Sequence, residues 1–169
     1  MGLPGGNKEV KTVFSDENGN FELNKFSFKA DKVRLGDPHG EYFTVGWYKD
    51  GEYISDGNTL PIKKGKKLNV DLHLVPYGQL QIHIKDTSCY NALDNVKIYF
   101  DGESDESRTF NPGLLYEKEG CMDVLDSKVK TTMGHKYFHW VSTKNNVTTT
   151  YYDTIFIDEN TVTTINVFY

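Results

Sequence analysis

Residues 42–50, YFTVGWYKD, and residues 137–145, YFHWVSTKN, decide the fold, because they are two copies of one strand and turn. They belong to a longer repeat, in which residues 40–74 align without gaps on residues 135–169 at an offset of 95 positions (135 minus 40). Large apolar side chains recur at every second position, as in a strand with one buried face. The repeat therefore predicts strand, turn, strand in each copy.

The alternation also predicts which side chains point into a core. Those of the first strands are Phe43, Val45, Trp47, Phe138 and Trp140. Those of the closing strands are Val70, Leu72, Leu74, Ile165, Val167 and Tyr169. The turns between the strands are expected at 49–51, Lys-Asp-Gly, and at 144–146, Lys-Asn-Asn, whose composition is typical of hairpins.

The composition favours the same class of fold. The chain has 169 residues and only two alanines, Ala30 and Ala92, whereas Val, Ile, Thr, Tyr and Phe are plentiful. Ala is the strongest helix former, and β-branched and aromatic residues suit a pleated, half-buried strand. We therefore expect an all-β protein.

The repeat predicts two tandem β-sandwich domains. We place their boundary where Val-Pro-Tyr-Gly at 75–78 interrupts the strand pattern, so that the domains span residues 1–76 and 77–169. The second domain opens with alternating strands at 78–84 and 95–100. Subtracting 95 places the counterpart of the first of these strands before the chain and that of the second at positions 0 to 5, at its very start. We therefore expect the first domain to lack its N-terminal strands and the chain to be an N-terminally shortened segment.

The motif Asp-Glu-Asn-Gly-Asn at 16–20 has two interpretations. Its acidic and amide residues are spaced as in a calcium loop, but an EF-hand loop needs Gly at its sixth position and Glu at its twelfth. Here the Gly is fourth and the twelfth residue is Ser27. Asn-Gly is a strong hairpin signal, because Gly adopts the left-handed conformation without steric cost. We therefore predict a tight turn between strands at 10–14 and 21–28.

Residues 15–21, Ser-Asp-Glu-Asn-Gly-Asn-Phe, resemble the T-D-x-x-G-x-F signature of carboxypeptidase-regulatory-like domains, and residues 69–74 are similar to the closing strand of that family. These domains are prealbumin-like (transthyretin-like) β-sandwiches of bacterial surface proteins. The resemblance covers residues 8–76 and reaches the second domain through the repeat; it departs from the family where the first two strands should be. It implies two tandem Ig-like or prealbumin-like Greek-key sandwiches, non-catalytic, secreted or lipid-anchored, that serve as spacers or binding modules.

Charge and hydropathy exclude two kinds of partner. A formal net charge of -5 and a pI of about 5.5 give a phosphate backbone little to attract, so we expect no nucleic acid. No stretch is apolar enough to span a bilayer, so we expect no transmembrane segment.

The resemblance places the protein outside the cell or in the periplasm, anchored to the cell surface through a segment outside this chain. We expect a monomer.

The sequence carries no motif of a known reaction or metal centre. It has no nucleophile elbow, zinc-protease or phosphate-loop motif. The best histidine pair, His135 and His139, is followed by no further ligand at a zinc spacing. We therefore expect no catalytic residues, no metal and no cofactor. A flexible, solvated loop best explains the acidic stretch after the strand at 95–100, and a weak cation site is the alternative, with these candidates: Asp101, Glu103 and Asp105.

Cys89 and Cys121 are the two cysteines of the chain. In an exported protein they can form a disulfide that closes a loop of about thirty residues and contributes roughly 3 to 4 kcal/mol to stability. Two free, buried thiols are the alternative, because neither cysteine lies in a redox or zinc motif.

The tyrosines offer a candidate ligand surface, formed by Tyr42, Tyr48, Tyr53 and Tyr137. Exposed tyrosines stack on sugar rings or anchor protein partners, so the expected partners are surface glycans or other surface proteins. Cross-strand pairs that stabilise a sheet explain the same residues. We expect a non-enzymatic exported bacterial protein that acts as a structural spacer or adhesion module. The alternative is an accessory carbohydrate-binding module that uses the exposed tyrosines.

Overall fold

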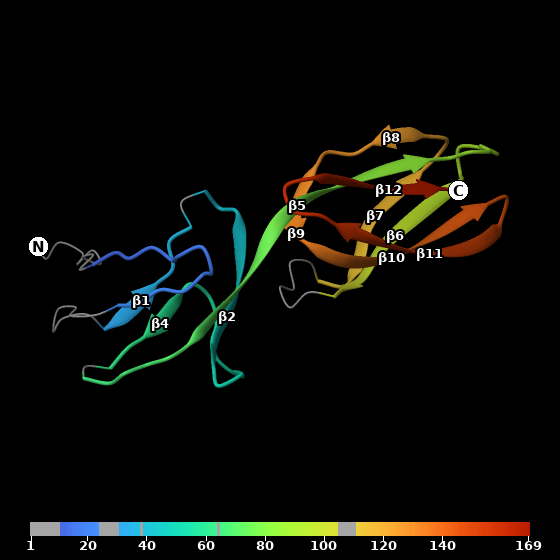
Figure 1. Ribbon diagram of the computed structural model, residues 1–169. Helices are drawn as coiled ribbons and strands as arrows, with labels where there is room; N and C mark the ends of the chain where they lie inside the picture. The colour runs from blue at the N-terminus through green and yellow to red at the C-terminus, as the bar shows by residue number, and fades with distance from the viewer. Residues whose placement is uncertain (1–10, 24–30, 38, 64, 105–110) are drawn as a thin grey trace, which may run out of the picture.

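The computed structural model describes residues 11–23, 31–37, 39–63, 65–104 and 111–169, and every regular element among them is a β-strand (Figure 1). The predicted all-β class is confirmed. Within the described part of the chain, no helix is long and apolar enough to cross a membrane. Figure 1 shows two lobes, and a single long strand, β5, runs from one lobe into the other.

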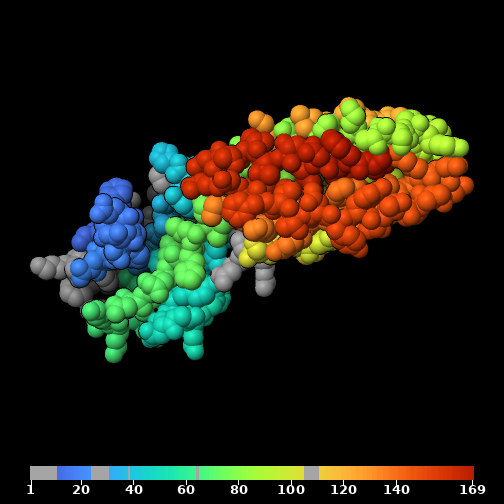
Figure 2. All heavy atoms as spheres, turned by 45° about the vertical axis from the view of Figure 1, so that its right-hand side comes forward, coloured from blue at the N-terminus to red at the C-terminus, as the bar shows by residue number. Residues whose placement is uncertain are grey.

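The larger lobe is built from two layers of strands. One layer is a fully antiparallel sheet in the order β11 (Val147–Ile157), β10 (Gly134–Lys144), β6 (Asn95–Glu103) and β7 (Gly113–Glu119). The other layer is formed around the second half of β5 (Asp71–Lys85) by β12 (Val162–Phe168), β8 (Asp123–Leu125) and β9 (Val129–Thr132). Figure 2 shows these strands as one continuous packed body.

The core of the larger lobe lies between these layers and follows the strand alternation. Its buried residues are Leu80, Ile82, Ile84, Val96, Ile98, Phe100, Phe138, Trp140, Ile157, Ile165, Val167 and Tyr169. Alternate residues of the second half of β5 and of β6, β10 and β12 contribute to it, because successive side chains of a strand point to opposite faces. The predicted inward faces of residues 138–140 and 165–169 are therefore confirmed.

The smaller lobe contains both the first copy of the hairpin and a separate short ribbon. The hairpin joins β2 (Tyr42–Lys49) to β3 (Glu52–Ser55), and the antiparallel ribbon pairs β1 (Lys32–Arg34) with β4 (Thr59–Pro61). Asp50 and Gly51 both have positive φ, 52° and 81°, as a tight hairpin turn requires. Asn145 and Asn146 have φ of 47° and 63° at the corresponding turn between β10 and β11. Both predicted hairpins are confirmed.

The two copies end differently. The first half of β5 pairs antiparallel with β2, next to its own hairpin. In contrast, β12 pairs in parallel with the second half of β5, in the layer opposite its own hairpin. Leu74, which the alternation predicts to point inward, is 36% exposed. This prediction is wrong, because Leu74 lies where β5 leaves the smaller lobe and has not yet entered the core of the larger one.

β5 is continuous through residues 75–78, where the sequence predicts an interruption. Hydrogen bonds pass through this point on both sides: the N–H of Tyr77 donates to the carbonyl of Glu41 (2.9 Å), and the N–H of Met133 donates to the carbonyl of Pro76 (2.8 Å). Pro76 lacks an N–H but its carbonyl is paired, so the strand tolerates it. The expected interruption is wrong, and the division into domains at residues 76 and 77 remains a prediction.

Gly78 marks a close approach of two chain segments. A Cβ atom built on Gly78 would lie 2.3 Å from the carbonyl oxygen of Asp158 and 2.6 Å from Cγ2 of Ile157. Real Cβ atoms do not come so close, so a side chain here would separate β5 from the end of β11. Gly78 is therefore explained by packing and not by a break in the strand.

The motif at 16–20 forms the predicted turn. The N–H of Gly19 donates to the carbonyl of Asp16 (3.0 Å), and Gly19 has φ of 79°. The Asp16 carboxylate accepts the N–H groups of Asn18 (2.9 Å) and Asn20 (2.8 Å). These bonds, that from Asn20 above all, lower the pKa of Asp16. The flanking residues 11–14 and 21–23 are not strands, which corrects that expectation; the rest of the predicted strands lies outside the described residues.

Candidate functional site

A row of three rings crosses the outer face of the four-stranded sheet. Strand register places His139 of β10 opposite Tyr152 of β11 and opposite Tyr99 of β6. The rings of Tyr99 and His139 are stacked, with centroids 4.5 Å apart and planes within 3°. The rings of His139 and Tyr152 are 5.7 Å apart and tilted by 33°. We call these three residues the aromatic row.

Asp101 fixes the central ring of the aromatic row. A register shift at Tyr137 and Phe138 places Asp101 beside His139, and Nδ1 of His139 lies 2.6 Å from Oδ1 of Asp101. An ionised carboxylate only accepts, so the imidazole donates this hydrogen bond. The pairing holds the imidazole parallel to Tyr99 and leaves Nε2 of His139 as the second polar atom of the ring.

The stacking limits what the aromatic row can bind. A sugar packs on the face of an aromatic ring, but Tyr99 and His139 each present one face to the other. Tyr152 stands at the end of the row and is 78% exposed, so its ring offers the largest free surface. The aromatic row therefore offers one accessible ring beside one polar pair, which suits a small contact with a glycan or protein partner.

The four tyrosines predicted as a ligand surface lie in two places. Tyr42, Tyr48 and Tyr53 belong to the hairpin of the smaller lobe, whereas Tyr137 lies on β10. Tyr48 stacks on His73 (4.0 Å, 21°) and meets Tyr53 edge to face (5.6 Å, 77°). The structure brings Tyr48 and Tyr53 together and keeps Tyr137 in another sheet, while Tyr42 lies at the opposite end of β2 from Tyr48.

The four tyrosines also differ in the exposed fraction of their surface, and Tyr48 is half-buried. Tyr42, Tyr53 and Tyr137 are 41%, 55% and 39% exposed. Tyr99, a member of the aromatic row, was not singled out from the sequence, because only strand register shows that it lies opposite His139. Alternation along β6 gives the only sequence signal, since it predicts that Tyr99 faces away from the core.

Asp101 and Glu103, at the end of β6, pair with different residues. Asp101 accepts from His139, whereas Glu103 pairs with Nζ of Lys136, whose side chain is fully buried. Nζ of Lys136 also donates to the hydroxyl of Thr132 (2.8 Å). Asp105, the third cation candidate, lies outside the described residues. Asp101 and Glu103 thus belong to separate hydrogen-bonded pairs.

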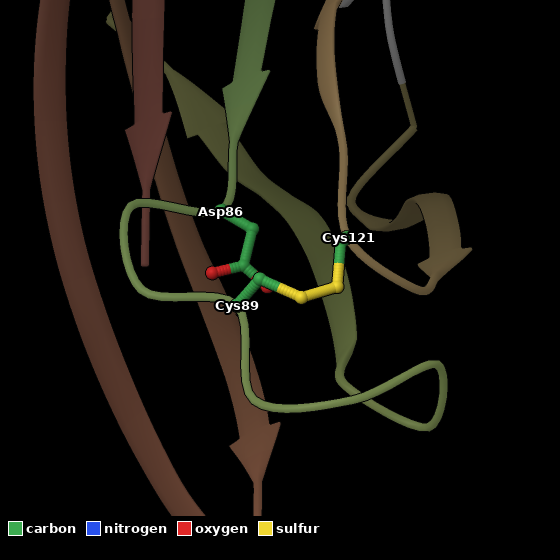
Figure 3. A group of neighbouring side chains, drawn as sticks. All are labelled: Asp86, Cys89 and Cys121. Carbon is green, nitrogen blue, oxygen red and sulfur yellow. A yellow bond between two sulfur atoms is a disulfide. The ribbon is translucent and has the colours of Figure 1, made fainter.

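Cys89 and Cys121 are joined in a disulfide at one end of the larger lobe (Figure 3). Their Cα atoms are 5.2 Å apart, within the usual range for a bridge, and 32 positions separate them in the sequence. Asp86, at the end of β5, lies beside them, and one of its carboxylate oxygens is within 4.8 Å of both sulfurs. The sequence indicates the two cysteines but not Asp86, because Asp-x-x-Cys matches no ligand motif.

The same end of the lobe carries further buried polar groups. Nζ of Lys144 lies 2.5 Å from Oδ1 of Asp86 and 4.9 Å from the centre of the Tyr169 ring. Burial, together with the charges of Asp86 and Asp94, raises the pKa of Tyr169 to about 12. The carboxylates and the phenol therefore share one poorly solvated environment, in which a phenolate is unfavourable.

A cavity of about 150 Å³ lies along β5 and β7 and is lined by Leu80, Ile82, Leu115, Tyr116, Ser127 and Val129. Burial and the nearby Asp126 raise the pKa of Tyr116, so its hydroxyl stays neutral at physiological pH. The lining is mostly apolar and the volume suits one small ring at most. This cavity has the character of imperfect packing between the layers.

Neither a protein-family model, nor a curated protein, nor a solved structure matches this chain. The resemblance to carboxypeptidase-regulatory-like domains therefore remains a prediction from residues 15–21 and 69–74. The function has to be argued from the geometry described above.

Proposed function

We propose that the chain is a non-enzymatic, exported bacterial β-sandwich protein that acts as a structural spacer or adhesion module. The observation that carries this proposal is β5, which spans Asp71–Lys85 and is shared by both lobes. It pairs with β2 on one side of the junction and with β9, β8 and β12 on the other. A shared strand resists bending better than a flexible linker, and this suits a spacer.

Side-chain contacts reinforce the junction. Nζ of Lys130, on β9, lies 3.9 Å from the centre of the Tyr77 ring and donates to the carbonyl of Gly40. The ring of Tyr77 in turn meets Phe43 of β2 edge to face at 6.4 Å. These contacts connect β2, β5 and β9 around the point where β5 changes lobes. They support a fixed angle between the lobes.

Export is supported by the disulfide between Cys89 and Cys121, because such bonds persist in oxidising compartments and are rare in the cytosol. The finer fold we propose is a pair of prealbumin-like Greek-key sandwiches in tandem. The two hairpins at equivalent positions of the repeat favour this arrangement.

Labelling of the intact cells that produce the protein tests the location. A membrane-impermeant amine reagent is expected to modify exposed lysines such as Lys85 before lysis, with an abundant cytosolic protein as the control. If modification requires lysis, the surface proposal is overturned. Mass spectrometry of the recovered chain gives the readout.

Glycan binding is a second candidate function, favoured by one observation: Tyr152 is 78% exposed at the end of the aromatic row. The ring would stack on a sugar, and the Asp101–His139 pair beside it would hydrogen-bond the sugar hydroxyls. This site differs from the tyrosines of the smaller lobe, so the two surfaces can be tested separately.

A broad panel of immobilised glycans, probed with the purified chain, tests this candidate. Binding that Tyr152→Ala loses would place the site on the aromatic row, whereas binding lost by the double variant Tyr48→Ala, Tyr53→Ala would place it on the hairpin. Each variant is the matched control of the other. If the chain binds no glycan, this candidate is rejected and the spacer or protein-adhesion function stands.

A further inference from the structure

The cysteine end of the larger lobe has the ligands of a metal site once its disulfide is opened. The sulfurs of Cys89 and Cys121 and one carboxylate oxygen of Asp86 all lie within 4.8 Å of one another (Figure 3). A tetrahedral zinc ion binds sulfur at about 2.3 Å and carboxylate oxygen at about 2.0–2.2 Å. Its ligand atoms are therefore about 3.3 to 3.8 Å apart. Opening of the disulfide lets the two sulfurs separate to this distance, and the carboxylate oxygen already lies within 4.8 Å of both.

A second observation concerns Asp86 itself. Its side chain is fully buried, yet Oδ2 has no hydrogen-bond partner among the described residues. A buried, unpartnered carboxylate oxygen is costly, and a bound cation would satisfy it. The other oxygen, Oδ1, accepts from Nζ of Lys144 (2.5 Å) and from the N–H of Ser88 (3.0 Å). Metal-binding carboxylates are commonly held by such outer hydrogen bonds, which fix their orientation.

The charges and the access route are also compatible with a divalent ion. Two thiolates and one carboxylate carry three negative charges, which Lys144 and a divalent cation together balance. Both cysteines are exposed, whereas the side chain of Asp86 is buried, so an ion can enter from the sulfur side. Water can supply the fourth ligand from that side.

We propose that the reduced chain binds one zinc ion, or a similar thiophilic divalent metal, through Cys89, Cys121 and Asp86. A phosphine supplies two electrons to the disulfide and takes an oxygen atom from water, whose two protons complete the two thiols; a dithiol supplies both the electrons and the protons and becomes a disulfide itself. Metal binding then releases both thiol protons as two sulfur–metal bonds form. The disulfide and the metal are mutually exclusive, so one site holds the loop at 86–94 against Cys121 in either redox state.

Cobalt titration of the full-length chain tests the proposal directly. The chain is reduced with a phosphine, freed of metal and titrated with Co²⁺, whose bonds to thiolate absorb strongly in the near ultraviolet. We expect one Co²⁺ per chain, displaced by one Zn²⁺, and no binding by the oxidised chain. Absence of the thiolate–cobalt absorption in the folded, reduced chain would overturn the proposal.

Variants assign the ligands. Asp86→Asn is expected to weaken Co²⁺ binding at least about 100-fold, since loss of an outer partner alone costs 10- to 100-fold. Asp153→Asn, an exposed acid on β11, is the matched control and should bind as the parent chain does. Equal affinity of Asp86→Asn and the parent chain would contradict the assignment of Asp86.

If Asp86→Asn does not fold, two measurements on the parent chain test the zinc site. Zinc should slow alkylation of both thiols, and it should raise the melting temperature of the reduced chain, because the site exists only when the lobe is folded. Unchanged alkylation rates and an unchanged melting temperature in saturating zinc would reject the site.

Discussion

The two copies of the repeat begin alike and end in different environments. Phe43 and Phe138 occupy equivalent positions of the repeat, but Phe43 is half-buried on β2, whereas Phe138 is 1% exposed and packs on Phe100. Among the described residues, only Trp47 and Leu60 are buried hydrophobics in the smaller lobe, against twelve in the core of the larger one. Hairpin formation is therefore a local property of the sequence, whereas burial of the hairpin depends on a second layer of strands.

The largest expected effect is the loss of stability when either of the two equivalent phenylalanines is truncated. Phe138→Ala should cost about 3 to 5 kcal/mol of unfolding free energy, because it leaves a cavity in a closed core. The equivalent Phe43→Ala should cost roughly half as much or less, since less of its surface is removed from water. Urea titration followed by circular dichroism measures both. Equal losses would show that the two lobes have equally closed cores.

The disulfide should contribute nearly as much to the free energy of unfolding as the side chain of Phe138 does. Closing a loop of 32 residues corresponds to roughly 3 to 4 kcal/mol in the chain-entropy account, so the double variant Cys89→Ser, Cys121→Ser should lose that amount. Calorimetry of this variant in chelator, beside the oxidised parent, gives the readout. Mass spectrometry of the parent after alkylation without reductant is the control, and two modified thiols would contradict the disulfide.

A smaller effect is expected at the junction. Gly78→Ala places a Cβ against Asp158 and Ile157, so we expect a loss of about 1 to 3 kcal/mol, as for other overpacked sites. Gly36→Ala is the matched control, because a Cβ at Gly36 meets nothing within 4 Å. If the two variants melt at the same temperature, β5 and β11 do not approach as closely as described.

The smallest expected effect is a loss of stability at high pH, caused by Tyr169 in the larger lobe. Tyr169 has a folded pKa of about 12 against an ordinary value of 10.0, so the unfolded chain loses this proton first as the pH rises. Its contribution to stability is therefore complete below pH 10 and is lost as the pH rises towards 12. Tyr169→Phe should remove this part of the decline, measured as the difference in melting temperature between the two chains. Parallel declines would contradict the raised pKa.

Local features were predictable from the sequence. The alternation gave the buried faces of β10 and β12, and Asp-Gly and Asn-Asn gave the two hairpin turns, because periodicity and positive φ are properties of neighbouring residues. The turn at 16–20 followed from Asn-Gly in the same way.

Long-range pairing was not predictable. Nothing in the periodicity of β12 distinguishes a parallel partner in the other layer from an antiparallel partner beside its own hairpin. Pro76 and Gly78 usually end strands, but here a paired carbonyl and a close approach explain them. The aromatic row and the position of Asp86 beside the cysteines likewise depend on register and loop geometry.

The proposed spacer role requires that β5 join the two lobes into one rigid body. ¹⁵N relaxation of the isotopically labelled chain tests it most directly, because it reports the tumbling of each lobe and the fast motion of the junction. We expect one common rotational correlation time for β2 and β10, with residues 75–79 as rigid as the core strands. Separate correlation times, with high mobility between Val75 and Gln79, would contradict it.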